Sequence, residues 1–388
     1  MRVLHFLPVY VPAWQYGGPI LSVSRLCEGL IRQGVDIRVI TTNAGLPNFP
    51  PDQLGLPQSV NGVEVIYYPV DHNARVIRSK ALVKALPAHM SWAELLHLSS
   101  IWQPLGVPIQ KAAHAAGVPV IQTPRGALGP YSWRRGLWKK VPYFLLKERP
   151  LLQCAAALHC TTTQEVTELN WLSPKTPIFT LPNPLDLSEL SCKPGIGKDW
   201  RNSNAIPLDQ RLFLVSGRMH HKKGLDLLPH ALKAITHIPW HILFIGQDSD
   251  GTTLRLRRAF KQNGLINRST WLPSLPAADL IGPYNAADWL LLPSRHENFG
   301  NVVIEALACG CGVLVSDKVG VGHMLVGTGT PGAYMEVRDP NKWTQMLLTA
   351  LSSTRPGKRS ESFVKSNFSQ FLISQKAHHI YQRILSHG

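Results

Sequence analysis

The sequence predicts an α/β protein built from two doubly wound, Rossmann-like domains that face each other across a cleft. Its 388 residues exceed what one hydrophobic core usually supports. Apolar, strand-like segments alternate with helical segments in both halves, which indicates parallel sheets covered by helices. Residues 187–207 separate the halves, are rich in Ser, Gly, Pro and Asn, and lack periodicity. We expect a first domain over residues 1–186, a linker over 187–207, and a second domain over 208–388 that ends in a helix.

The first half shows strand and helix signals in alternation. Its expected elements are, in order, a strand over 3–8, a glycine turn at Gly17-Gly18, a helix over 19–33, and strands over 36–41, 63–68, 94–99 and 119–124. Pro19 in the first helical turn and Gly34 just after the helix are the usual residues at these ends. This order predicts a βαβ unit that continues into a larger parallel sheet.

The second half repeats this alternation. Its expected elements are a strand over 211–218, a helix from about Leu225, a strand over 241–246, a helix over 252–264, strands over 269–273 and 288–294, a helix that contains Glu305, and a strand over 312–317. Sheets of this kind hold their ligands at the carboxyl ends of the strands. Glycine-rich turns that open onto helices are therefore candidate ligand loops.

The composition is that of a globular protein, with 44% hydrophobic and 16% charged residues. No apolar run reaches the roughly 18 residues that a membrane helix needs, and the first residues lack the features of a signal peptide. We therefore expect a cytoplasmic protein. The six cysteines form no Cys-x-x-Cys pair, so neither redox work nor a zinc knuckle is expected. The net charge of +16 favours anionic partners, which include nucleic acid, phosphorylated ligands and an acidic membrane surface.

Two cations lie in one strand-to-helix connection of the second half. Gly217 and Arg218 end its first strand, and Lys223 follows before the next helix. Positive charges at the carboxyl edge of a sheet suit a bound diphosphate. The alternative is a solvated basic turn.

The stretch PSRHENFGNVVIEALACG, residues 293–310, contains two carboxylates with seven residues between them. Glu297 lies in a turn before a helix, and Glu305 lies in the first turns of that helix. Gly300 permits unusual backbone dihedrals, and free amides over residues 298–302 would point toward a bound anion. A carboxylate suits paired sugar hydroxyls, so both acids can face one bound molecule. The alternative is an acid that only interacts with the helix dipole.

These features together resemble the retaining glycosyltransferases of family 4, whose two Rossmann-like domains form the arrangement called GT-B. The matching residues are Glu297 and Glu305 for the E-x7-E signature, Gly217-Arg218 and Lys223-Gly224 for the phosphate motif, and Gly17-Gly18 for the N-terminal glycine loop. The segment LPNPLD, residues 181–186, resembles the end of the family's first domain. The segment TPRGALGP, residues 123–130, resembles one found in some bacterial members. The resemblance is strong in the second half and weaker in the first.

The resemblance implies transfer of a sugar from a UDP- or GDP-linked donor to an acceptor hydroxyl, with retention at the anomeric carbon and without a metal or other cofactor. Arg218 and Lys223 would stabilise the leaving diphosphate, since fixed cations stabilise developing charge. Glu297 would contact the donor sugar and Glu305 the ribose. The other residues implied in donor binding are Gly17, Gly18, Gly217, Asn298, Phe299, Gly300 and Asn301. No covalent intermediate is implied.

The acceptor side of the proposed cleft departs from the family pattern. Many relatives carry a His where this chain has Arg125, and a His-x-His where it has His97-Leu98-Ser99. His97 and Arg125 are our acceptor-side candidates.

Two other functions fit parts of the sequence. A GT-B nucleotide-sugar epimerase would use the same donor site and need no second substrate. A basic nucleic-acid-binding protein would use the charge, but the chain lacks an RRM, KH or helix-turn-helix signature and spreads its basic residues along its length. Nucleic acid is therefore not an expected partner.

The segment WRRGLWKKVPYFLLKER, residues 133–149, mixes basic and apolar side chains. Its cations are Arg134, Arg135, Lys139, Lys140, Lys147 and Arg149, and its apolar residues include Trp133, Trp138, Tyr143, Phe144 and Leu145. Such a segment can lie on anionic lipid, although Pro142 interrupts a single helix; packing on its own sheet is the alternative. We expect peripheral attachment to the inner face of the cytoplasmic membrane and a glycan or lipid-linked acceptor, such as an oligosaccharide or polysaccharide precursor.

Overall fold

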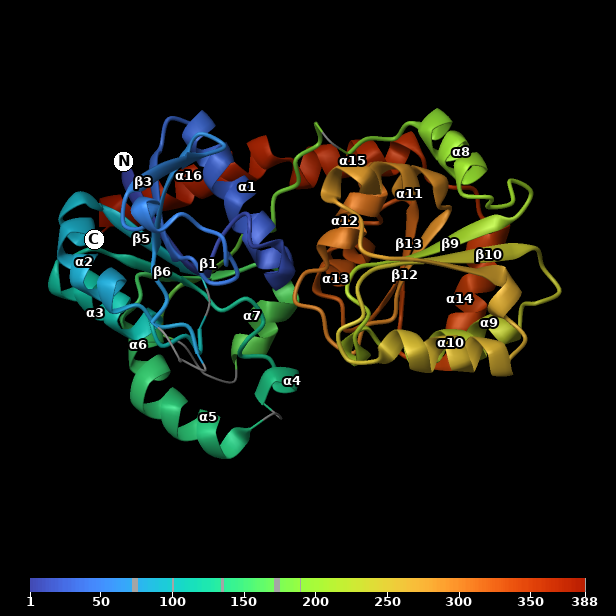
Figure 1. The fold of residues 1–388 in the computed structure, drawn as a ribbon, viewed down its shortest axis with the longest axis horizontal. Helices are drawn as coiled ribbons and strands as arrows, with labels where there is room; N and C mark the ends of the chain where they lie inside the picture. The colour runs from blue at the N-terminus through green and yellow to red at the C-terminus, as the bar shows by residue number, and fades with distance from the viewer. Residues whose placement is uncertain (72–75, 100, 134–135, 171–174, 189, 388) are drawn as a thin grey trace. The chain divides into compact units, whose positions relative to one another are not determined.

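The computed structural model describes residues 1–71, 76–99, 101–133, 136–170, 175–188 and 190–387. Two compact units make up the chain: unit 1 contains Met1–Pro184 and Gln370–Gly388, and unit 2 contains Leu185–Ser369. Each unit is a sheet of mostly parallel strands with helices on its faces (Figure 1). This agrees with the predicted pair of Rossmann-like domains.

Unit 1 contains an eight-stranded sheet in the order β3-β4-β2-β1-β5-β6-β7-β8. Its strands are β1 Arg2–Val9, β2 Asp36–Thr42, β3 Pro57–Val60, β4 Val63–Tyr68, β5 Leu95–Ser99, β6 Val120–Thr123, β7 Ala157–Cys160 and β8 Ile178–Thr180. Only β3 and β4 pair antiparallel. They form a hairpin around Asn61 and Gly62, whose positive φ values suit a tight two-residue turn.

Helices cover both faces of the sheet in unit 1. They are α1 Gly18–Arg32, α2 Lys80–Trp92, α3 Gly106–Ala115, α4 Pro130–Trp133, α5 Leu137–Tyr143, α6 Arg149–Cys154, α7 Thr163–Leu169 and α16 Gln370–His387, with shorter turns η1 Trp14–Tyr16, η2 Pro51–Gln53 and η3 Phe144–Glu148. Successive residues of β1 enter different cores. Val3 packs with residues of α1 and α16, and Leu4 packs with residues of α2 and α3. The alternation of a strand thus explains the two layers of helices.

The C-terminal helix α16 packs on α1 of unit 1. Gly29 permits the close approach, because a Cβ there would lie 2.9 Å from Cβ of Ser374. Further along α16, the Tyr381 hydroxyl lies 2.6 Å from Nδ1 of His97. The second domain expected over 208–388 therefore extends too far, because α16 belongs to unit 1. An amphipathic pattern shows that a helix has an apolar face, but not which sheet that face covers.

Unit 2 contains six parallel strands in the order β11-β10-β9-β12-β13-β14. They are β9 Arg211–Ser216, β10 Trp240–Ile245, β11 Ser269–Leu272, β12 Trp289–Leu292, β13 Gly312–Ser316 and β14 Ala333–Glu336. The helices are α8 Pro194–Ser203, α9 Leu228–Lys233, α10 Thr252–Gln262, α11 Ile281–Ala286, α12 Asn301–Ala308, α13 Gly320–Gly327, α14 Pro340–Ser352 and α15 Lys358–Phe368, with short turns η5 His221–Lys223, η6 Leu225–Leu227, η7 Ile266–Arg268 and η8 Ala277–Leu280. The central strands are almost fully buried, as parallel strands covered on both faces must be.

Helix α8 lies inside the segment expected to be an aperiodic linker. It packs on α11, where a Cβ on Gly197 would lie 2.3 Å from the carbonyl oxygen of Asn285. Arg201 is buried and forms an ion pair of 2.9 Å with Asp288. The linker expectation over 187–207 is wrong for this helix. Its packing uses glycine and a paired arginine, so the apolar stripe that marks most helices is weak.

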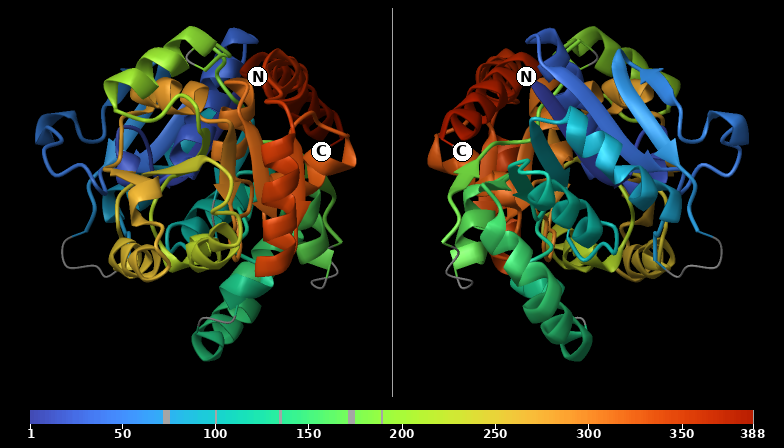
Figure 2. Two further views of the ribbon diagram at one scale, coloured as in Figure 1. Left: turned by 90° about the vertical axis from the view of Figure 1, so that its right-hand side faces the viewer. Right: turned by 90° about the vertical axis from the view of Figure 1, so that its left-hand side faces the viewer.

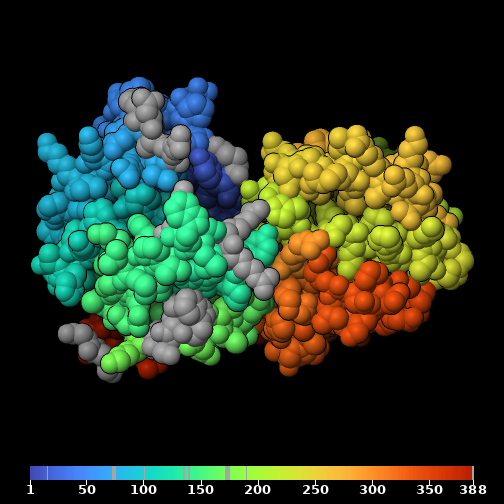
Figure 3. Space-filling model, turned by 90° about the horizontal axis from the view of Figure 1, so that it is seen from below, coloured from blue at the N-terminus to red at the C-terminus, as the bar shows by residue number. Residues whose placement is uncertain are grey.

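Residues 136–154 form a helical arm that projects from unit 1 (Figure 2). Seen from below, the arm occupies much of the face of unit 1 (Figure 3). Its exposed apolar residues are Leu137, Trp138, Val141, Leu145 and Leu146. Lys140 instead turns inward, donates to the carbonyl of Ser132 and lies over the Trp102 ring. Arg134 and Arg135 lie outside the described residues, and none of the described helices has the length and apolar character needed to span a bilayer.

Candidate active site

Glycines shape the loop that leaves β9 in unit 2. Gly217 has φ 113°, and a Cβ on neighbouring Gly246 would lie 1.9 Å from the Gly217 carbonyl oxygen. Only glycine therefore fits at Gly246, where the backbones that leave the carboxyl ends of β9 and β10 approach each other closely. Arg218 follows as an exposed residue, and it forms no hydrogen bond or ion pair with another residue that the structure describes.

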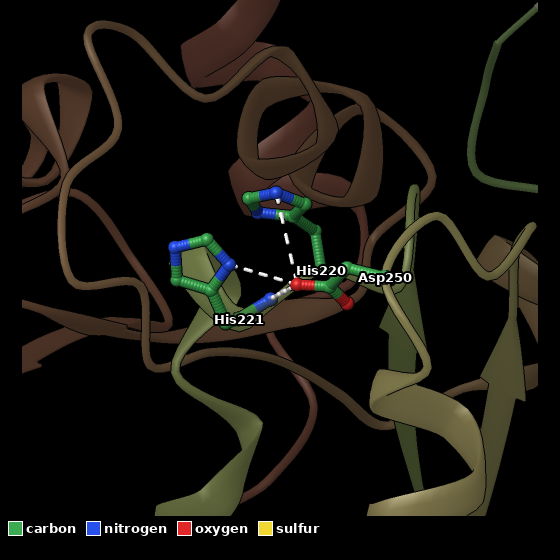
Figure 4. Close-up of side chains that lie close together, drawn as sticks. All are labelled: His220, His221 and Asp250. Carbon is green, nitrogen blue, oxygen red and sulfur yellow. Dashed lines mark hydrogen bonds and ion pairs between the residues drawn. The ribbon is translucent and has the colours of Figure 1, made fainter.

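Asp250 braces the same loop from the start of α10 (Figure 4). Its Oδ2 accepts hydrogen bonds from the backbone N–H and ring Nδ1 of His221, at 3.0 and 2.8 Å, and lies 3.7 Å from Nε2 of His220. Burial would raise the pKa of Asp250, but hydrogen bonds from Thr252 and His221 hold it below its usual range. Ligand atoms of the two histidines and Asp250 lie within 4.8 Å of one another, close enough for a metal ion, whereas the family resemblance implies a site without a metal. We interpret the cluster as a brace, because both oxygens of the carboxylate already accept hydrogen bonds.

Lys223 and Glu297 form the central ion pair of the site. Gly224 has φ 63°, and a Cβ there would lie 2.2 Å from the carbonyl oxygen of Pro293. This close contact packs the loop after β9 on the segment after β12. Lys223 Nζ consequently lies 2.7 Å from Glu297 Oε2, with the two side chains 20% and 25% exposed. Burial raises the pKa of Glu297, but the charge and hydrogen bond of Lys223 outweigh that effect and keep the carboxylate ionised.

The turn that carries Glu297 is held by the segment after β13. The Glu297 N–H donates to the Lys318 carbonyl at 2.8 Å, and its carbonyl accepts from the Gly320 N–H at 2.9 Å. Gly300, with φ 96°, then forms the N-cap of α12, whose first residue is Asn301. The Phe299 side chain is 3% exposed and packs in the core. Phe299 and Gly300 can therefore offer only backbone groups to a ligand at this turn.

Glu305 lies inside α12 and is 8% exposed. Its Oε2 accepts a hydrogen bond of 2.9 Å from the hydroxyl of Tyr284 in α11. Burial and the Glu305 charge raise the pKa of Tyr284 well above its usual value, so this hydroxyl stays protonated. Sequence reasoning missed Tyr284, because nothing in the local sequence indicates its contact with a residue 21 positions away.

The remaining candidates belong to unit 1. Gly17, with φ 91°, forms the N-cap of α1 and precedes Gly18, the first residue of that helix. The loop before them carries two exposed aromatic residues, Trp14 and Tyr16. Arg125 follows β6 and has φ 52°. The structure thus places Gly17 and Arg125 in loops that follow strands of the same sheet.

The His97 side chain is buried and contacts two other polar side chains. It is 1% exposed, its Nε2 lies 2.8 Å from Oγ1 of Thr123, and its Nδ1 lies 2.6 Å from the Tyr381 hydroxyl. Burial holds its pKa well below the usual value. Both ring nitrogens are occupied, so we do not retain His97 as a direct acceptor contact.

Family comparisons agree with this fold. The family described as "Glycosyl transferases group 1" matches residues 197–369, and the one described as "Glycosyl transferase 4-like domain" matches residues 17–184. The fold and these matches define a two-domain sugar transferase. The chain belongs to the group 1 glycosyltransferases with the GT-B fold.

Individual relatives show how far the similarity extends. A D-inositol 3-phosphate glycosyltransferase of Mycolicibacterium smegmatis is 32% identical over 162 residues, which cover 41% of this chain and 36% of that protein. D-inositol 3-phosphate glycosyltransferase 1 of Catenulispora acidiphila is 24% identical over 85% of this chain and 81% of its own. Sucrose-phosphate synthase from Thermosynechococcus elongatus superposes with a TM-score of 0.77 at 20% identity, covering all of both chains. HepE of Anabaena, solved with UDP-glucose, superposes with a TM-score of 0.76 at 16% identity, over 99% of this chain and 100% of that one. At these identities the two solved structures demonstrate a shared fold.

Proposed function

We propose that this glycosyltransferase takes its sugar from a UDP- or GDP-linked donor and transfers it, with retention and without a metal ion, to an acceptor hydroxyl. The observation that carries the proposal is the Lys223–Glu297 pair, 2.7 Å apart, at the carboxyl edge of the sheet in unit 2. The UDP-glucose bound by HepE, which has the same fold, supports a nucleotide-sugar donor.

Arg218 and Lys223 are the proposed cations for the donor diphosphate. Arg218 is exposed and forms no hydrogen bond or ion pair with another described residue, so its guanidinium can bind a phosphate. Lys223 has three N–H donors, so it can bond Glu297 and a phosphate oxygen together. At an effective dielectric near 20, one ion pair about 4 Å apart is worth roughly 4 kcal/mol. Charge that develops on the leaving diphosphate would make both contacts stronger in the transition state.

The two carboxylates have separate proposed roles. Glu297 is ionised and faces Lys223, so it can accept hydrogen bonds from hydroxyls of the donor sugar beside the diphosphate. Glu305 is oriented by Tyr284 and would accept hydrogen bonds from the ribose diol. The bond from the anomeric carbon to the diphosphate breaks while the bond to the acceptor oxygen forms on the same face. The diphosphate oxygen takes the acceptor proton, so no covalent sugar–enzyme bond is required.

The helical arm of unit 1 supports the proposed acceptor, a lipid-linked oligosaccharide or polysaccharide precursor in cell-surface glycan synthesis. Trp138 and Leu146 are 76% and 73% exposed, and Lys147 and Arg149 are exposed beside them. Apolar side chains flanked by cations are the chemistry that binds an anionic lipid surface. The protein would then attach peripherally to the inner face of the cytoplasmic membrane.

Co-sedimentation with anionic liposomes tests this attachment. The wild-type protein should sediment with the liposomes at low salt, and a Trp138→Ser, Leu146→Ser double variant should not. Leu208→Ser, at another exposed leucine in unit 2, is the matched control. Absence of wild-type binding, or full binding by the double variant, would contradict the membrane proposal.

A panel of nucleotide sugars tests the donor proposal. A donor at 100 times its dissociation constant should add about 2.7 kcal/mol to stability, and transfer should continue in the presence of EDTA. Isomerisation of a donor incubated alone would favour the epimerase instead. Loss of transfer with EDTA, restored by added metal, would point to the His220, His221 and Asp250 cluster.

A further inference from the structure

Arg125 lies at the carboxyl edge of the sheet in unit 1 with weak partners. Its Nη1 and Nη2 lie 3.5 Å from Oδ1 of Asn183 and from Oγ of Ser99, which are both neutral groups at the outer limit of a hydrogen bond. Its Nε is buried without a hydrogen-bond partner. The residue as a whole remains partly exposed, and it makes no ion pair with any residue in the described part of the chain.

The groups around Arg125 form no ion pair with it among the described residues. Glu165 is the nearby carboxylate and its charge favours the charged form of Arg125, but its oxygens accept hydrogen bonds from the backbone N–H groups of Gly126 at 2.5 Å and Thr161 at 2.7 Å. The three nearby imidazoles are neutral at pH 7. Burial, together with the Arg125 charge, lowers the pKa of His5 and His159 to about 3. Burial also holds the pKa of the third imidazole, His97, well below its usual value. Burial lowers the pKa of Arg125 to about 10, which still leaves the guanidinium charged.

This arrangement is unfavourable without a ligand. A guanidinium that loses hydration and gains no carboxylate destabilises the unit. The left-handed φ of 52° adds backbone strain for a residue with a side chain. Strain and an unpaired charge at a sheet's ligand edge indicate a binding role. The planar guanidinium fits a carboxylate or a phosphate through two parallel hydrogen bonds.

We propose that Arg125 binds a carboxylate or phosphate carried by the saccharide that unit 1 holds, so that the enzyme acts on an acidic sugar. The inference rests on the proposed transfer function, in which unit 1 holds the acceptor. The anion then belongs to an acidic acceptor, such as a uronic acid or a sugar phosphate. The Arg125 guanidinium forms with this anion the ion pair that Ser99 and Asn183 cannot form.

Calorimetry on the 388-residue protein tests the proposal by comparing glucuronate and glucose 6-phosphate with glucose. The wild-type protein should bind at least one of the two acidic probes roughly tenfold to a hundredfold more tightly than glucose. Arg125→Gln should abolish that preference and Arg125→Lys should keep part of it.

Two controls distinguish binding from a structural role. Arg38→Gln removes another arginine of unit 1, one that is already paired with Glu64, and should leave the preference unchanged. Arg125→Gln should not lower the melting temperature, because it removes an unpaired charge. A wild-type protein without preference for any acidic probe, a preference that survives in Arg125→Gln, or a lowered melting temperature of Arg125→Gln would each overturn the proposal. UDP binding should persist in every variant, and its absence from the wild type would instead refute the donor site in unit 2.

Discussion

The two carboxylates of unit 2 make the sharpest prediction, because their surroundings differ. Glu305→Gln keeps the shape of a buried side chain and an oxygen that can accept from the Tyr284 hydroxyl. The variant should therefore fold normally. It loses the negative charge that we assign to the ribose, so UDP and every UDP-sugar should bind less tightly.

The size of the effect follows from the burial of Glu305. The side chain is 8% exposed, so water cannot replace a lost contact efficiently. A hydrogen bond to a charged group contributes about 1.5 to 3 kcal/mol, which corresponds to a roughly 10- to 150-fold increase in the dissociation constant for UDP. Glu297→Gln should not weaken UDP binding at all. It frees Lys223 from its partner at 2.7 Å, which favours the diphosphate, and its deficit should appear in kcat and in the choice of donor sugar.

Isothermal titration with UDP, followed by transfer assays with several UDP-sugars, measures both effects. Glu361→Gln serves as the matched control, since Glu361 pairs with Lys358 on α15. Equal losses of UDP affinity in the Glu297 and Glu305 variants would refute the separation of roles. Unchanged UDP affinity in Glu305→Gln would refute its assignment to the ribose.

Three further predictions concern the diphosphate site, the buried Glu148 and the packing of α8. Arg218→Ala and Lys223→Ala should each lower kcat by roughly 10² to 10³ in steady-state assays, and full activity in both would contradict the diphosphate site. Burial raises the pKa of Glu148 to about 7, so the folded protein keeps this proton up to about pH 7, whereas the unfolded chain loses it at lower pH. The free energy of unfolding should therefore fall by roughly 1 to 3 kcal/mol as pH rises from about 5 through 7. Urea unfolding at pH 5 and pH 8 should show this loss, and Glu148→Gln should remove it. Gly197→Ala should destabilise unit 2 by roughly 1 to 3 kcal/mol in urea unfolding, because the new Cβ would clash with the Asn285 carbonyl. The control is Gly195→Ala on the same helix, whose Cβ would meet no atom within 4 Å, so that the free energy of unfolding should stay the same or rise slightly.

The strands of unit 2 show what sequence patterns can predict. The buried strands β9, β10, β12 and β13 appear as continuous apolar runs, because parallel strands are covered on both faces. The short strands β3, β7, β8 and β14, of three or four residues each, are not predicted from the sequence, although β11, also of four residues, is. Their place in the sheets depends on partners far away in the chain.

The site shows the same limit at the level of single residues. Its motifs are local, so Gly217 to Gly224 and Glu297 to Glu305 could be recognised within short stretches of sequence. Their supporting contacts are not local: Tyr284 reaches Glu305 only because α11 packs beside α12. The strained conformation of Arg125 is likewise invisible in a sequence, because residues other than glycine rarely adopt positive φ.

The return of α16 to unit 1 affects the order in which the two units can be completed during synthesis. Unit 2 is continuous over Leu185–Ser369, whereas unit 1 needs both Met1–Pro184 and the helix that begins at Gln370. Until α16 leaves the ribosome, the face of α1 around Gly29 lacks its cover and the His97 ring lacks the Tyr381 hydroxyl. Unit 2 is therefore complete in sequence before unit 1 is, although unit 1 starts the chain. A chain truncated after residue 369 would contain every residue of unit 2 joined to a unit 1 that lacks α16.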